Sequence, residues 1–192
     1  ILSRGGTVLH TSRCPEFRTP EGRERAAAIA RVFKLDAIII IGGDGSFAGA
    51  KLLSELGVPV IGIPATIDND IGCTEYTIGF DTALNTVKDA IDKIKDTTYS
   101  HERCSIIQVM GRQAGYIALN AAIANGAEIC LIPEKPYDVN ADVIQPILAG
   151  RSRGKTHFII VVAEGACSCE DLAAQIKQTI GVTPAVSILG YI

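Results

Sequence analysis

The most constraining feature of the sequence is an apolar run, Ala37–Ile41, that leads directly into the turn Gly42-Gly43-Asp44-Gly45-Ser46. The run predicts a buried strand, and the turn after it has no side chain at three of its five positions. Backbone N–H groups of such a turn can approach a phosphate closely, and Asp44 between the glycines can hold a Mg²⁺ ion. Ser46 is expected to cap the following helix, and its hydroxyl is within reach of the same phosphate. An ordinary turn between a strand and a helix is the alternative, because glycine is common in such turns.

A second polar turn follows the next short apolar strand, Val60–Ile63, and reads Pro64-Ala65-Thr66-Ile67-Asp68-Asn69-Asp70. Turns at the ends of successive parallel strands lie at the same edge of the sheet, where open α/β folds bind ligands. A carboxylate there can accept the proton of an attacking hydroxyl, and a threonine hydroxyl with Mg²⁺ can stabilise a phosphoryl group in transfer. The alternative is a loop in which Asp and Asn bond only to their own backbone.

Strand and helix patterns alternate along the whole chain, which predicts βαβ units, a parallel sheet and an α/β fold. We expect a crossing between two lobes in the loop 64–78 and the helix after it, with a ligand cleft between the lobes. The expected strands are 37–41, 60–63, 104–109, 128–132, 157–163 and 185–189. The expected helices cover about 20–33, 46–56, 80–96, 113–125, 140–149 and 169–180.

Charge and cysteine content narrow the function classes. The 192 residues carry 21 acidic and 18 basic side chains, a net charge of −3, which gives no reason to expect a nucleic-acid or membrane partner. No apolar run approaches the roughly 18 residues that span a bilayer. The 6 cysteines contain no C-x-x-C pair, so we expect reduced thiols and a cytoplasmic protein. The first residue is Ile1 rather than Met, which suggests an internal fragment.

Further candidate residues follow the later strands. Met110-Gly111-Arg112 comes after the strand 104–109, where glycine allows close backbone approach and arginine offers a forked donor to phosphate. Arg103 precedes the same strand. Glu164 ends the strand 157–163 and suits a sugar hydroxyl. Taken singly, each arginine could form a surface ion pair and Glu164 could be solvated.

Several of these motifs, in one order, resemble ATP-dependent 6-phosphofructokinase of the bacterial type over nearly all of the chain. The resemblance implies a phosphofructokinase-like fold with two Rossmann-like, three-layer αβα lobes and mostly parallel sheets, here truncated. Residues 1–79 would be part of the ATP-binding lobe, and residues 80–192 the fructose-6-phosphate-binding lobe. The matching segments are Ser12–Arg18, Ile41–Gly49, Ile63–Asp70, Thr74–Asn85, Ser100–Arg103, Val109–Leu119 and Ile132–Glu134.

The resemblance implies a glycolytic kinase that transfers the γ-phosphoryl group of MgATP to the 1-hydroxyl of fructose 6-phosphate. Asp68 would be the general base, Thr66 and Arg112 would act on the transferring group, and Asp44 with Asp70 would hold Mg²⁺. The ATP site would comprise Arg13, Cys14, Gly43, Asp44, Gly45 and Ser46. The sugar phosphate would contact Thr66, Ile67, Asp68, Arg103, Met110, Gly111, Arg112 and Glu164.

Regulation and assembly are also implied. In the family the residue at Arg103 reaches across a subunit interface, so a homotetramer is expected. The allosteric effector site would use Lys95, Gly126, Ala127, Glu128, Arg153, Lys155, Thr156 and His157.

Three alternatives stay open. Pyrophosphate-dependent relatives carry Asp where this chain has Gly45 and Lys where it has Ala65, so both small residues favour ATP. Lipid and NAD kinases share the Gly-Gly-Asp-Gly turn but lack the later motifs. A non-catalytic nucleotide-binding fragment is the third. Since the family extends beyond both ends of these 192 residues, we expect the fragment alone to have little or no kinase activity.

Overall fold

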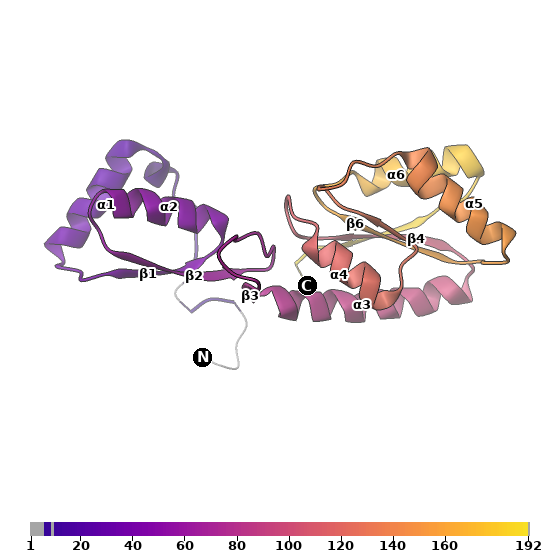
Figure 1. Ribbon diagram of the computed structural model, residues 1–192, viewed down its shortest axis with the longest axis horizontal. Helices are drawn as coiled ribbons and strands as arrows, with labels where there is room; N and C mark the ends of the chain where they lie inside the picture. Colours follow the sequence, from indigo (N-terminus) through magenta and orange to yellow (C-terminus); the bar gives the residue numbers. More distant parts are fainter. Residues whose placement is uncertain (1–5, 9, 192) are drawn as a thin grey trace. The chain divides into compact units, whose positions relative to one another are not determined.

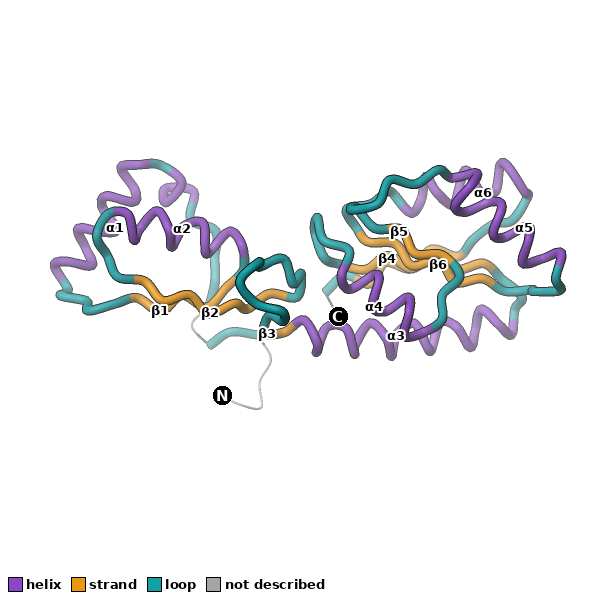
Figure 2. Tube along the Cα trace, viewed as in Figure 1, coloured by secondary structure: helices purple, strands orange, loops and turns teal. Residues whose placement is uncertain are grey.

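The computed structural model describes residues 6–8 and 10–191, so the expectation drawn from Ile1 concerns a residue outside these ranges. The chain forms two compact units, Ile1–Pro64 and Ala65–Ile192, each built on a parallel sheet (Figures 1 and 2). The units therefore divide within a strand, 15 residues before the boundary expected after residue 79. The α/β class, with helices alternating with parallel strands, is confirmed.

The first unit places two helices on one side of its strands. Thr19 caps the first helix, because its Oγ1 accepts a hydrogen bond of 3.1 Å from Gly22 N, and Pro20 occupies the first helical position as its sequence predicts. The elements are η1 (Pro15–Arg18), α1 (Pro20–Val32), β1 (Ile38–Gly42), α2 (Asp44–Glu55) and β2 (Val60–Thr66).

The two faces of this first sheet differ in how far their side chains are buried. Ile38 and Val60, which are opposite each other in the β1–β2 pair, pack with the core that α1 and α2 form. The other face presents Ile39, Ile41 and Ile61, each more than half exposed. The isoleucine run is thus half buried rather than fully buried in the part of the chain that the structure describes.

The second unit contains a larger sheet with the strand order β5-β6-β4-β7, all parallel. A two-residue strand, β3, pairs with the end of β2 and leads into the 21-residue helix α3. The elements are β3 (Ile78–Gly79), α3 (Phe80–Ser100), β4 (Cys104–Val109), α4 (Tyr116–Asn125), β5 (Ile129–Leu131), η2 (Val139–Ile144), α5 (Gln145–Ser152), β6 (Phe158–Ala163), α6 (Cys169–Ile180) and β7 (Ala185–Leu189).

Alternate residues of β4 and β6 bury opposite faces of this sheet, which makes the second unit a three-layer αβα sandwich (Figure 1). Ile106 and Ile160 pack with the core that contains α5 and α6. Ile107 and Ile159 pack with α3 and α4 on the other side. Burial of apolar area on both faces is the main stabilising term for such a sheet. Within the described residues, no helix is both long and apolar enough to cross a membrane.

Two helices differ from the sequence expectation, one in its start and one in its continuity. The helix expected over 113–125 starts at Tyr116, because Ala114 N donates to Gly111 O at 2.8 Å and closes a turn first. The helix expected over 140–149 is split into a π-helical segment, η2, and α5. Pro146 explains the split, since proline has no N–H to donate to the preceding turn.

The capping role expected of Ser46 is wrong. Helix α2 begins at Asp44, and its N-cap is Gly43, with no side-chain capping bond. Ser46 and Phe47 both donate their backbone N–H to Gly43 O at 3.0 Å, so Ser46 already lies within the first turn. The carboxylate of Asp44 is favourable at this position because it faces the positive end of the helix dipole.

Candidate functional site

The second unit brings together three of the expected catalytic and metal-binding residues. Arg112 Nη1 lies 3.9 Å from Asp68 Oδ2 and 3.9 Å from Asp70 Oδ2. The two carboxylates belong to the loop after β2, whereas Arg112 belongs to the turn after β4. One guanidinium therefore faces two acids at the carboxyl ends of strands, which is where α/β folds place their ligands.

Asp68 is the most perturbed of these groups. Its side chain is only 9% exposed, whereas that of Arg112 is 61% exposed. Burial raises the pKa of Asp68 above its ordinary value, and the neighbouring charges of Asp70 and Glu164 raise it further, while Arg112 opposes the rise. A buried carboxylate with a raised pKa is a better proton acceptor than an ordinary aspartate, so its position is suited to general-base chemistry.

The loop between Thr66 and Asp70 is tightly folded. Thr66 Oγ1 accepts a hydrogen bond of 3.2 Å from Asp68 N, which places the threonine hydroxyl beside the backbone of the acid. Asn69 has φ of 55°, a left-handed conformation that asparagine tolerates better than most residues. Ile67 packs partly into the core formed with α3 and α4, so it anchors the loop. The side chains of Thr66, Asp68 and Asn69 consequently project from a loop whose backbone these contacts hold.

The turn carrying Arg112 is held by a carboxylate. Arg112 has φ of 53° and Gly111 has φ of 142°, so two consecutive residues have positive φ. Glu164 Oε1, at the end of β6, accepts hydrogen bonds from Gly111 N at 3.1 Å and Arg112 N at 2.6 Å. Met110 precedes this turn and lines a cavity with Glu164. Glu164 is therefore brought to Met110, Gly111 and Arg112, as expected, and one of its oxygens binds their backbone.

Sequence reasoning assigned no role to two further residues at this turn. A Cβ on Gly165 would lie 2.2 Å from the carbonyl oxygen of Arg112, so only glycine fits there. Glu134 Oε1 accepts a hydrogen bond of 2.7 Å from Gly115 N, the N-cap residue of α4. The segment Ile132–Glu134 was part of the matching pattern, but the contact with Gly115 spans 19 residues and has no local sequence signal.

Arg103 lies at the other end of the same strand. Its backbone N–H donates to Thr98 O in α3, and its carbonyl accepts from Phe158 N at the start of β6. The six residues of β4 separate it from Met110, a span of about 23 Å at roughly 3.3 Å per residue. Arg103 instead lines a cavity of about 270 Å³ with Ser105 and Ser187. Within one chain it does not join Arg112 and Glu164.

The expected nucleotide-binding residues lie in the first unit. Gly43 is the N-cap of α2 and Asp44 is its first residue, and a Cβ on Gly45 would meet nothing within 4 Å. Arg13 and Cys14 are exposed and precede η1. Phe17 in η1 lies against Gly49, one turn beyond Ser46, since a Cβ on that glycine would come within 3.1 Å of the ring. This contact joins the segment after Cys14 to the helix that carries the glycine-rich turn.

The expected Mg²⁺ ligands, Asp44 and Asp70, belong to the first and second unit respectively. Within residues 6–8 and 10–191, no cluster of three or more His, Cys, Asp or Glu side chains is placed to hold a metal ion. The side chain of Asp70 is 27% exposed, and its Oδ2 lies 3.9 Å from Arg112 Nη1. One or two carboxylates are nevertheless a normal protein contribution to Mg²⁺ sites, in which waters and substrate phosphates supply the other ligands. Asp44 offers one such carboxylate in the first unit, and Asp70 offers one in the second.

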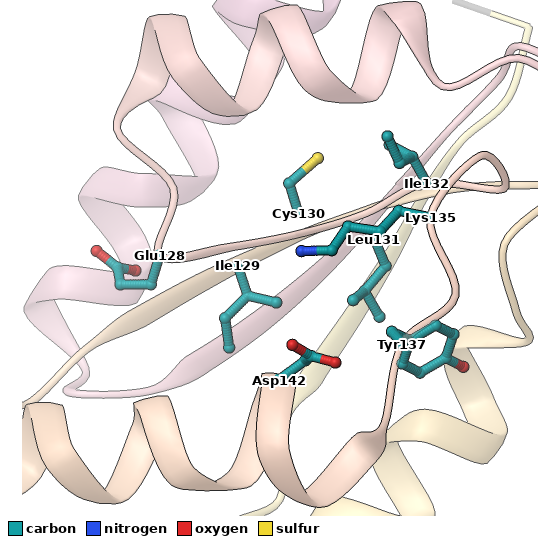
Figure 3. A pocket seen from close by; sticks show the side chains of 8 residues that line it. All are labelled: Glu128, Ile129, Cys130, Leu131, Ile132, Lys135, Tyr137 and Asp142. Atoms are coloured by element: carbon teal, nitrogen blue, oxygen red, sulfur yellow. The ribbon is translucent and has the colours of Figure 1, made fainter.

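The residues expected to bind an effector lie near the amino ends of β5 and β6. Lys155 Nζ donates to Glu128 Oε1 at 2.5 Å, and Glu128 Oε2 accepts from Ile159 N at 2.7 Å. Glu128 also lines a cavity of about 160 Å³ along β5, in which Lys135 reaches back beside the strand (Figure 3). This cavity is a second candidate for ligand binding in the unit.

Other members of the expected effector set are distributed around this pair. Lys95 Nζ donates to Asn125 O at 2.8 Å, directly before Gly126 and Ala127. The His157 ring contacts that of Tyr99 edge-on, with centroids 5.1 Å apart. Thr156 lies between Lys155 and His157, whereas Arg153 Nε donates to Ala149 O at the end of α5.

Comparison with known proteins places the chain among phosphofructokinases. The sequence model of the family described as "Phosphofructokinase" matches residues 1–192. The chain is 56% identical over 192 residues to "ATP-dependent 6-phosphofructokinase 1" of Clostridium perfringens, covering 100% of this chain and 60% of the relative. It is 52% identical over 193 residues to "ATP-dependent 6-phosphofructokinase" of Clostridium botulinum, with the same two coverages. The chain thus spans about 60% of the length of the curated relatives it matches.

Solved structures give the same grouping. The phosphofructokinase of Saccharomyces cerevisiae matches with a TM-score of 0.85 and 33% identity, over 99% of this chain and 30% of that chain. The enzyme of Pichia pastoris matches with a TM-score of 0.87 and 34% identity, over 98% of this chain and 24% of that chain. A pyrophosphate-dependent enzyme from Nitrosospira multiformis matches with a TM-score of 0.74 at 22% identity, covering 89% of this chain and 49% of that one, which supports the fold alone.

Proposed function

The chain belongs to the phosphofructokinase family, and we propose that the full-length protein transfers the γ-phosphoryl group of ATP to the 1-hydroxyl of fructose 6-phosphate. The observation that carries this proposal is the buried carboxylate of Asp68, with a raised pKa, beside the Arg112 guanidinium at 3.9 Å. Phosphoryl transfer to an alcohol needs a proton acceptor and a nearby positive charge, and this pair supplies both.

In the proposed reaction the ionised Asp68 accepts the proton of the 1-hydroxyl as that oxygen forms its bond to the γ-phosphorus. The bond between the γ-phosphorus and the bridging oxygen of ATP breaks, and ADP leaves. Arg112 and the hydroxyl of Thr66 face the phosphoryl oxygens and stabilise their charge. Ile67, Met110, Gly111 and Glu164 orient the sugar phosphate, with Glu164 also holding the backbone of Arg112 at 2.6 Å.

We propose that Asp44 and Asp70 hold Mg²⁺, and that Arg13, Cys14 and the Gly43–Ser46 turn bind the nucleotide. When bound, Mg²⁺ supplies a positive charge that neutralises the phosphates of the donor. ATP is the favoured donor because the side chain of Gly45 is absent and a Cβ there would meet nothing within 4 Å, which leaves space for a nucleotide phosphate. Small Ala65 in β2 also lacks the cation that would bind pyrophosphate.

Arg103 supports a proposal about assembly. It lies a full strand length from Met110 in its own chain, which supports a contact with fructose 6-phosphate in another subunit. We therefore propose a homotetramer, in which Lys95, Gly126, Ala127, Glu128, Arg153, Lys155, Thr156 and His157 form the effector site.

The test is a coupled kinase assay on the full-length protein with fructose 6-phosphate, Mg²⁺ and either ATP or pyrophosphate as the donor. We expect Mg²⁺-dependent turnover with ATP and none with pyrophosphate. The variant Asp68→Asn should bind both substrates in calorimetric titrations while it loses turnover. Turnover that persists undiminished in Asp68→Asn would refute the general-base assignment, and turnover only with pyrophosphate would reassign the donor.

A further inference from the structure

The loop that carries Asp68 is closed by two residues that the proposed mechanism does not use. Thr77 is 4% exposed and lies 11 residues after Thr66. Its hydroxyl donates a hydrogen bond of 2.6 Å to Thr66 O, and its backbone N–H donates one of 2.9 Å to Asn69 Oδ1. The loop is thus fastened at two points, one beside the threonine and one beside the acid.

Asn69 completes the closure from its own side. Its side-chain Nδ2 donates to Glu75 O at 3.1 Å, so both the nitrogen and the oxygen of the side-chain amide form hydrogen bonds within the loop. Asn69 lies between Asp68 and Asp70, and its φ of 55° reverses the local chain direction. The conformation of this one residue consequently sets the directions in which the two carboxylates leave the backbone.

Thr77 also joins the loop to a long helix. Phe80 N, at the first position of α3, donates to Thr77 O at 3.2 Å, and Phe80 is 2% exposed. The short strand β3 pairs Gly79 with Thr66. The loop between β2 and β3 therefore ends on the start of α3, a rigid element that packs along the sheet (Figure 1). A loop held in this way can maintain a reacting geometry that free loops lose.

We propose that Asn69 and Thr77 are positioning residues for phosphoryl transfer: together they lock the Thr66–Asp70 loop so that the hydroxyl of Thr66 and the carboxylate of Asp68 face the reacting groups. This inference rests on the proposed function. Neither side chain touches the reacting atoms, and their effect is on geometry. Because a misplacement of about 1 Å can reduce a rate roughly 100-fold, the loss should appear in kcat rather than in nucleotide binding.

The experiment compares Thr77→Val with Thr77→Ser in the full-length protein. Valine has the shape of threonine but no hydroxyl to bond Thr66 O, whereas serine keeps the hydroxyl. We expect Thr77→Val to lower kcat by about 10- to 100-fold with an unchanged KM for ATP, and Thr77→Ser to restore most of kcat. A purely structural role would lower thermal stability and the active fraction in Thr77→Val but leave kcat per folded enzyme unchanged.

A second variant covers the case in which Thr77→Val does not fold. Asn69→Gly keeps the left-handed backbone accessible but removes both amide bonds, so it should give a similar loss of kcat. An unchanged kcat in a folded Thr77→Val or Asn69→Gly protein overturns the positioning role while the wild type stays active. An inactive wild type rejects the proposed function itself, which separates the two failures.

Discussion

In the second unit, carboxylates at the two ends of the sheet differ in how closely they are bonded to the rest of the chain. At the carboxyl end, Asp68 is nearly buried and its nearest cation, Arg112, is 3.9 Å away, so its pKa is raised. At the amino end, Glu128 is bonded by Lys155 at 2.5 Å and by Ile159 N at 2.7 Å. Glu128 is thus bonded within the chain at both carboxylate oxygens, whereas Arg112 stays 3.9 Å from the carboxylate of Asp68.

Backbone conformation distinguishes the two ends less sharply. The turns at the carboxyl end contain Asn69 and Arg112 in left-handed conformations, which cost energy for residues other than glycine. At the amino end the left-handed positions near the sheet are Gly126 and Gly154, where glycine is favoured, and Glu102, with φ of 49°, before β4. Left-handed residues other than glycine thus occur at both ends, and at the carboxyl end two of them lie beside the candidate catalytic groups. The predictions below test this contrast.

The largest expected effect is that of Asp68→Asn. Loss of the general base should reduce kcat by about 10²- to 10⁴-fold, measured in the coupled assay. The same change should raise the midpoint of thermal unfolding, because burial disfavours the ionised form of Asp68 in the folded protein at neutral pH. A variant that loses both activity and stability would contradict the view that this carboxylate is held at the expense of stability.

The next effect is that of Gly165→Ala, which tests the turn at Arg112. Its added Cβ would lie 2.2 Å from Arg112 O, so the turn must move, and we expect kcat to fall by about 100-fold. Gly181→Ala is the matched control, since Gly181 has φ of 70° and open space at the end of α6. The control should cost about 1 kcal/mol of unfolding free energy in denaturant titrations and leave kcat unchanged. Equal kcat in both variants would exclude a role for the turn.

A smaller effect is expected in the pH dependence of kcat/KM. Since Asp68 must be ionised to accept a proton, activity should rise with pH through its pKa, with a midpoint above the ordinary value of 3.8. Asp70→Asn removes the second cause of the raised pKa, so the midpoint of the acid limb should move to lower pH even if the maximum rate falls. An acid limb that stays in place would show that Asp70 does not act on Asp68.

The smallest effect on activity is expected at the amino end, for Asn125→Ala. Asn125 Nδ2 donates to Lys88 O at 3.1 Å and to Asp92 Oδ1 at 2.7 Å, which joins α4 to α3. Losing these bonds in a buried setting should cost about 1–2 kcal/mol of unfolding free energy. We expect kcat to be unchanged, as measured on the fully folded variant at low temperature. A large fall in kcat would erase the functional distinction between the two ends of the sheet.

Much of the fold follows from local sequence patterns. The strands 104–109 and 185–189 have the predicted bounds, and the helix beginning at Thr19-Pro20 is capped as predicted. Hydrophobic runs and caps act over a few residues, so they can be read directly. The predictions that Ser46 caps a helix and that a helix starts at residue 113 were wrong. Backbone hydrogen bonds to Gly43 O and Gly111 O determine where these two helices begin.

The sequence by itself determined the residue types of the candidate site: a carboxylate and a hydroxyl in one loop, and an arginine after a later strand. Only the tertiary structure decided that Asp68 is buried, that Glu164 bonds the backbone of Arg112, and that Thr77 fastens the loop of Thr66. These contacts join residues 11 to 52 positions apart, and such pairs leave no periodic pattern in the sequence. A pKa or a hydrogen bond of this kind depends on what packing places nearby, which only the folded chain defines.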